Sequence, residues 1–126
     1  MAGELILIVE DNEKNMKLAR DVLQFKGFRT LEAGNADDAV ATAEEKLPDL
    51  ILMDIQLPGT DGVGALRLLR AGSRTASIPV IALTAYAMGE DRQRLIDAGF
   101  DGYLTKPIDI KAFPQQVQKF CRQRPE

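Results

Sequence analysis

The stretch from Asp49 to Pro58 constrains the fold of this chain more than any other part of the sequence. Residues 50–53 are all apolar, Asp54 follows them directly, and glycines at 59 and 62 then break the chain. A short continuous apolar run bounded in this way is typical of an interior strand of a parallel sheet. Asp54 is therefore expected at the carboxyl end of a buried strand. A charge in such a place is costly unless a metal or a cation compensates it, so the rest of the sequence should supply one.

Comparable apolar runs recur along the chain and alternate with segments of helical periodicity. The expected strands are residues 5–9, 28–32, 50–53, 79–83 and 102–105, and the expected helices are residues 13–26, 36–46, a segment after the glycine at 62 that runs to about 70, 88–98 and 109–122. Pro114 is expected to make the last helix begin nearer Ala112 or to make it irregular. One side of that helix is expected to hold Ile110, Phe113, Val117 and Phe120. Each connection is long enough for a right-handed crossover helix, so the sequence predicts an α/β fold with a five-stranded parallel sheet covered by helices on both faces.

The composition indicates one soluble globular domain over residues 1–126, expected in the cytoplasm and without an effector domain. No apolar run approaches the roughly 18 residues of a membrane span, and the N-terminus has no signal-peptide pattern. A net charge of −3 argues against a nucleic-acid surface. Arg67, Arg70 and Arg74 are interpreted as a solvated helix face. The single Cys121 excludes an internal disulfide and is interpreted as a small apolar helix residue.

Polar residues end the apolar runs at five positions. These are Glu10, Asp11, Asp54, Thr84 and Lys106. Because the carboxyl ends of parallel strands share one edge of a sheet, we expect these side chains to converge in a crevice there. Each has a plainer interpretation when taken alone: Asp11 or Asn12 caps the first helix, Thr84 bonds its own backbone, and Lys106 is solvated. Asp54 is the exception, since the plainer interpretation leaves an unpaired acid among apolar side chains.

The charges of this group indicate what the crevice binds. Three carboxylates and one ammonium sum to −2, so a divalent cation would bring the total to zero. Oxygen ligands in a chain without histidine select a hard ion, and Mg²⁺ fits best, with a backbone carbonyl near Gln56 as a further ligand. A carboxylate beside Mg²⁺ and an ammonium is also a nucleophile for in-line attack on phosphorus. Thr84 would then donate to one phosphoryl oxygen, and Lys106 would contact another.

These residues resemble the signature of response-regulator receiver domains of two-component signalling. The matching elements are Glu10-Asp11, Asp54 within the stretch 52–59, Thr84-Ala85 and Lys106-Pro107. They agree with the family in type, order and spacing over essentially the whole chain. The segments around Asp11, Asp54 and Thr84 are most similar to the stand-alone DivK type and to receivers attached to hybrid kinases. The resemblance implies a flavodoxin-like, doubly wound (βα)5 fold with strand order 2-1-3-4-5.

The resemblance also implies a function. Asp54 would accept a phosphoryl group from a phosphohistidine of a sensor histidine kinase or a histidine phosphotransfer protein. Mg²⁺ would be held by Glu10, Asp11, Asp54 and the backbone carbonyl of Gln56. The protein would be a phosphoacceptor that takes part in its own phosphotransfer and autodephosphorylation rather than an enzyme.

A switch is implied as well. Thr84 and Tyr103 would move together on phosphorylation, and a cis peptide before Pro107 would aim Lys106 at the crevice. Output would pass through the fourth helix, the fifth strand and the fifth helix to a protein partner, with the chain a monomer or a phosphorylation-dependent dimer. Gln56 and Tyr86 flank the expected path of hydrolytic water and are expected to set the lifetime of the phosphoryl group.

The same residues bear on other possible functions. The chain could be an intermediate in a phosphorelay, which the sequence does not separate from a terminal switch. An aspartyl-phosphate phosphatase needs a second acid two positions after the nucleophile, where this chain has Gln56. A docking module that no longer accepts phosphate is disfavoured because all five polar residues of the crevice are intact. A DNA-binding regulator in its usual form is not expected, since no residues are left for an effector domain.

Overall fold

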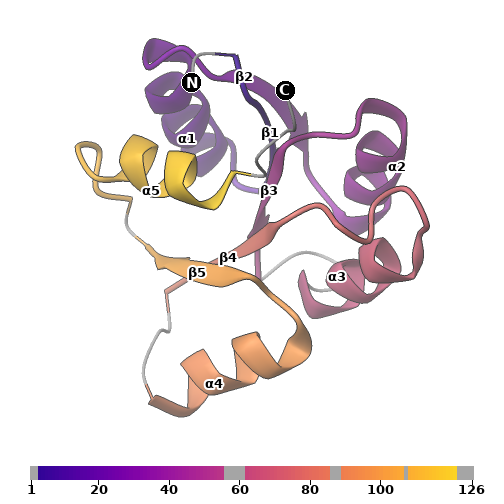
Figure 1. Ribbon diagram of the computed structural model, residues 1–126. Coiled ribbons are helices and arrows are strands. Elements are labelled where there is room, and N and C mark those ends of the chain that lie inside the picture. Colours follow the sequence, from indigo (N-terminus) through magenta and orange to yellow (C-terminus); the bar gives the residue numbers. More distant parts are fainter. Residues whose placement is uncertain (1–2, 56–61, 86–88, 107, 122–126) are drawn as a thin grey trace.

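A five-stranded parallel sheet carries the chain, with its strands in the order β2-β1-β3-β4-β5 (Figure 1). The computed structural model describes residues 3–55, 62–85, 89–106 and 108–121, with the side chains of 89–92 left out. The strands are β1 (Leu5–Val9), β2 (Arg29–Ala33), β3 (Leu50–Asp54), β4 (Val80–Thr84) and β5 (Gly102–Thr105). The helices are α1 (Glu13–Phe25), α2 (Ala36–Lys46), α3 (Gly62–Ala71), α4 (Gly89–Ala98) and α5 (Phe113–Phe120). The predicted α/β class, five parallel strands and their order are confirmed.

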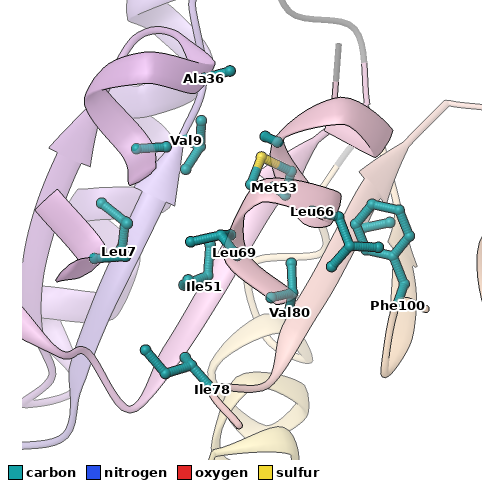
Figure 2. Close-up of a cluster of buried hydrophobic side chains, with 14 of the residues drawn as sticks. Leu7, Val9, Ala36, Ile51, Met53, Leu66, Leu69, Ile78, Val80 and Phe100 are labelled. Atoms are coloured by element: carbon teal, nitrogen blue, oxygen red, sulfur yellow. The ribbon is translucent and has the colours of Figure 1, made fainter. Parts of the chain in front are cut away.

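Two apolar layers hold the helices to the sheet, because successive side chains of a strand point to opposite faces. One layer lies under α2, α3 and α4, and Figure 2 shows its centre, where Leu7, Ile51 and Val80 meet Leu66 and Leu69 of α3. The other layer lies under α1 and α5. It is built from the strand residues that alternate with those of the first layer, among them Ile6, Ile8, Leu50, Leu52, Ile81, Leu83 and Leu104. Burial on both faces explains why β1, β3 and β4 read as unbroken apolar runs.

The first helix is capped by Asn12, whose side chain accepts a hydrogen bond from the backbone N–H of Asn15 over 3.0 Å. This contact decides between the two cap candidates, Asp11 and Asn12, and the carboxylate of Asp11 is therefore not used as the cap. The helix ends before Gly27, which has a φ of 94°. Glycine takes this left-handed conformation without steric cost, as expected for a helix C-terminus.

The last helix is shorter than expected and begins where Pro114 permits. Residues 109–112 do not belong to α5, because the carboxylate of Asp109 accepts hydrogen bonds from the backbone N–H groups of Lys111 and Ala112 over 3.0 and 3.3 Å. Ala112 is the N-cap and Pro114 sits in the first turn, as the sequence predicts. The expectation that Ile110 shares a side of this helix with Phe113 is wrong: Ile110 precedes α5 and is 59% exposed.

The interpretation of Arg70 as part of a solvated helix face is also wrong. Its guanidinium donates to the carbonyls of Ala76, Ile78 and Gly99 over 3.0, 2.7 and 3.2 Å. It also pairs with the carboxylate of Asp101 at 2.7 Å. Arg70 thus ties the end of α3 to the loops before β4 and β5.

Candidate functional site

Three carboxylates meet at the carboxyl edge of the sheet. Glu10 and Asp11 follow β1, and Asp54 is the last residue of the neighbouring β3. One carboxylate oxygen from each of the three lies within 4.8 Å of the other two. Glu10 and Asp54 are buried and Asp11 is exposed, so the cluster opens to solvent on one side.

The ammonium of Lys106 lies between two of these acids. Its Nζ is 3.0 Å from Oε1 of Glu10 and 3.0 Å from Oδ2 of Asp54. The lysine reaches them because β5 ends at Thr105, one residue earlier, and its own backbone N–H is bonded to β4 through the carbonyl of Thr84. The structure therefore brings together four of the residues singled out in the sequence.

The electrostatics of the cluster show an excess of negative charge. Burial raises the pKa of Glu10, the hydrogen bond with Asp54 raises it further, and the bond from Lys106 only partly offsets these effects. Burial lowers the pKa of Lys106, but its bonds to Glu10 and Asp54 outweigh this and leave the pKa above its usual value. One ammonium does not compensate three carboxylates, and a further cation would relieve the site.

The donor set fits a hard divalent ion. Carboxylate oxygens are the ligands that Mg²⁺ prefers, and it usually keeps several of its waters, as the exposed side of the cluster permits. The carboxylate of Glu10 is held in place by the backbone N–H of Asn12, which donates to its Oε2 over 3.2 Å. Sequence reasoning missed this contact, because a backbone donor leaves no mark in the residue type.

The two residues expected to switch lie on the other face of the sheet. Thr84 is buried at the end of β4 and pairs in register with Thr105, while Tyr103 pairs with Ala82 and packs against the layer under α2, α3 and α4. The alternation of side chains places Thr84 on the same face as Tyr103. By the same alternation, the side chain of Asp54 belongs to the opposite face of the sheet. Thr84 therefore lies next to the site, but its side chain is on the other face.

Three further residues singled out in the sequence lie outside the described residues. They are Gln56, Tyr86 and Pro107. The structure gives no position for the carbonyl of Gln56, the side chain of Tyr86 or the peptide bond before Pro107.

A small hollow adjoins the acidic cluster on the side of α1. Glu10, Asn15 and Lys106 are its polar residues, while Leu18, Ala19 and Ile108 are among its apolar ones. Leu18 is 37% exposed although it is a large apolar residue. Apolar surface is thus available directly beside the ammonium and the acids.

Among the described residues, none of the helices has the length and apolar character that a membrane span needs.

Comparison with known proteins agrees with this geometry. The chain is 42% identical to the polar-differentiation response regulator DivK of Brucella anthropi over 115 residues, which cover 91% of this chain and 94% of that protein. It is 38% identical to the receiver domain of a sensor histidine kinase from Pseudomonas aeruginosa, which was solved with a magnesium ion coordinated in its active-site cleft. That match has a TM-score of 0.86 and covers 94% of this chain and 98% of the other.

A more distant match supports the fold alone. The chemotaxis protein CheY4 of Vibrio cholerae is 24% identical, with a TM-score of 0.88 and coverage of 94% of this chain and 99% of that one.

The family model described as the response regulator receiver domain matches residues 6–118. The chain therefore belongs to the response regulator receiver domains, the phosphoacceptor signalling proteins of two-component systems.

Proposed function

We propose that Asp54 is the residue that accepts the phosphoryl group, and that the donor is a phosphohistidine of a sensor kinase or of a histidine phosphotransfer protein. One observation carries this proposal: the carboxylate of Asp54 lies among Glu10, Asp11 and Lys106. A nucleophilic carboxylate for phosphoryl transfer needs such a set of cationic partners and metal ligands around it.

The transfer is a substitution at phosphorus. A carboxylate oxygen of Asp54 forms the new O–P bond while the N–P bond of the phosphohistidine breaks, and the imidazole nitrogen leaves with the bonding pair. The carboxylates of Glu10, Asp11 and Asp54, with the carbonyl of Gln56, would hold Mg²⁺, which neutralises charge on the transferred group when bound. Lys106 already stands 3.0 Å from Asp54 and is placed to accompany that charge.

Phosphorylation would change the contacts around Asp54. The phosphoryl group carries a charge of about −1.5 to −2 and several acceptor oxygens, where the free carboxylate had a single charge. Lys106 and the hydroxyl of Thr84 would bond to these oxygens in only one arrangement of the loops. Thr84 shares a sheet face with Tyr103, so its displacement toward the edge would favour a second position of that ring and shift a pre-existing equilibrium.

The proposed output surface is formed by α4, β5 and α5, and its partner is a protein. Tyr103 belongs to β5, which is the edge strand of the sheet next to β4. A phosphorylation-dependent dimer would form through that same surface. Gln56 and Tyr86 remain proposed determinants of the lifetime of the phosphoryl group.

The acceptor assignment is tested by labelling. Incubation with Mg²⁺ and phosphoramidate, whose N–P bond resembles that of phosphohistidine, should produce an acid-stable, alkali-labile protein label. Asp54→Asn should lose this label, whereas Asp37→Asn, on the exposed face of α2, should keep it. Label of the same chemistry and amount in the Asp54→Asn variant would refute the proposal.

A further inference from the structure

Helix α3 approaches the carboxyl end of β3 at Gly62, where the structure leaves no space for a side chain. A Cβ atom at this position would lie 2.8 Å from the carbonyl oxygen of Asp54, 2.9 Å from the Cα of Ile55 and 3.3 Å from the Cγ of Met53. Carbon atoms need about 3.5 Å or more to their neighbours. The first two atoms belong to the backbone, so they cannot turn aside as the end of a flexible side chain would.

The same approach is fastened by hydrogen bonds on both sides. The backbone N–H of Gly62 donates to the carbonyl of Ile55 over 3.1 Å. The N–H of Ile55 in turn donates to the carbonyl of Leu83 on β4 over 3.2 Å. Ile55 is therefore held between the start of α3 and the end of β4, and this fixes the peptide that joins it to Asp54.

This peptide carries the Cα atom from which the carboxylate of Asp54 extends. That carboxylate has to meet Lys106 at 3.0 Å and share a cluster with Glu10 and Asp11. Ligands of a divalent ion must lie within about 0.2 Å of their proper distances. A displacement of the peptide by a few tenths of an ångström would therefore matter at the metal site, although the fold would tolerate it.

We propose that Gly62 is a positioning residue for the phosphoacceptor: the absence of a side chain at this position sets where the Asp54 carboxylate lies and hence how tightly Mg²⁺ binds. The inference rests on the proposed function of Asp54. The described atoms nearest to a Cβ at Gly62 belong to the backbone of Asp54 and Ile55 and to the side chain of Met53, so a substitution there would act through Asp54 and not on the phosphoryl group. Its residue type alone suggested no more than a chain break after the strand.

Three glycine substitutions separate this role from general destabilisation. Gly62→Ala places a methyl group against the Asp54–Ile55 peptide. Gly34→Ala, after β2 on the same edge of the sheet, meets no described atom within 4 Å. Gly102→Ala, at the opposite end of β5, places its Cβ 2.8 Å from Cε1 of Phe120 and so crowds a side chain, not the backbone, away from the acidic cluster.

The measurement is the rise of the urea unfolding midpoint with increasing Mg²⁺ concentration. Because Mg²⁺ that binds the folded state refolds a marginal protein, the titration reports the affinity even for a variant that is partly unfolded without the ion. We expect Gly62→Ala to bind Mg²⁺ about tenfold more weakly than the parent chain, the usual effect of losing support behind a ligand. Gly34→Ala and Gly102→Ala should keep the parent affinity.

The outcomes are distinct. A Gly62→Ala variant that binds Mg²⁺ within twofold of the parent would overturn the inference and leave the proposed function standing. An equal loss of affinity in Gly62→Ala and Gly102→Ala would also overturn it, because destabilisation alone would then explain the effect. A parent chain whose midpoint does not respond to Mg²⁺ would instead refute the proposed metal site itself.

Discussion

The backbone N–H of Lys106 donates to the carbonyl of Thr84 over 2.8 Å, so β5 stays fastened to β4 one residue beyond the last register pair of the two strands. The side chains of these two residues belong to opposite faces of the sheet. The side chain of Lys106 reaches Glu10 and Asp54, whereas that of Thr84 lies on the same face of the sheet as Tyr103. The backbone that carries the ammonium to the acids is thus held in place, and the residue that holds it, Thr84, has its side chain on the other face of the sheet.

Lys106→Ala is expected to lower the free energy of unfolding by about 2 kcal/mol in the absence of divalent ions, because two buried carboxylates lose their cation. Saturating Mg²⁺ should recover most of this loss. The measurement is urea unfolding with EDTA or with Mg²⁺. Lys17→Ala, which removes the cation of an exposed pair with Asp21, should change little. A metal-free Lys106→Ala variant as stable as the parent would show that the pairing contributes nothing.

Leu18→Asp tests whether a protein donor docks on the apolar wall beside Lys106: it places a charge there and removes apolar burial, and docking at this wall predicts transfer from such a donor slowed by about tenfold or more. Transfer from phosphoramidate, which needs no docking surface, should keep its rate. Leu68→Asp, at a leucine of α3 that is 50% exposed, serves as the matched control. Equal slowing with both donors would mean that the substitution damages the site instead of the docking surface.

Arg70→Ala is expected to lower the free energy of unfolding by about 2 kcal/mol, since three carbonyls and one carboxylate lose a donor whose side chain is only 27% exposed. Arg67→Ala, at an exposed arginine of the same helix, should be nearly neutral. Thermal or urea unfolding measures both. If the two variants lose the same stability, the contacts of Arg70 carry no special weight.

Alkylation of Cys121 should depend strongly on folding. Burial raises the pKa of this thiol from 9.0 to about 12, and the charges of Glu4 and Asp49 add to the effect. The folded pKa lies above the unfolded one, so the contribution of the thiol to stability is complete below pH 9.0 and is lost as the pH rises toward about 12. At pH 8.5 the native protein should react with iodoacetamide roughly a hundredfold or more slowly than the urea-unfolded chain, because only the thiolate reacts. Equal rates in the two states would contradict the shift.

Local patterns in the sequence were sufficient for the elements of the fold. The apolar runs marked the buried strands, the glycine at 27 marked the end of the first helix, and Pro114 marked the start of the last one. The polar residues that end β1, β3 and β4 also predicted the edge at which the acids gather. These features follow from the sequence because strand burial and helix ends are set by residues within a few positions of one another.

Tertiary structure alone decided the contacts that give the site its geometry. The clearance at Gly62 depends on how closely α3 approaches β3, the pairing of Arg70 with Asp101 spans 31 positions, and that of Lys106 with Asp54 spans 52. No local pattern encodes such approaches, because they depend on how the crossover helices pack on a twisted sheet. The sequence by itself thus determined which side chains stand at the sheet edge, and packing determined the distances between them.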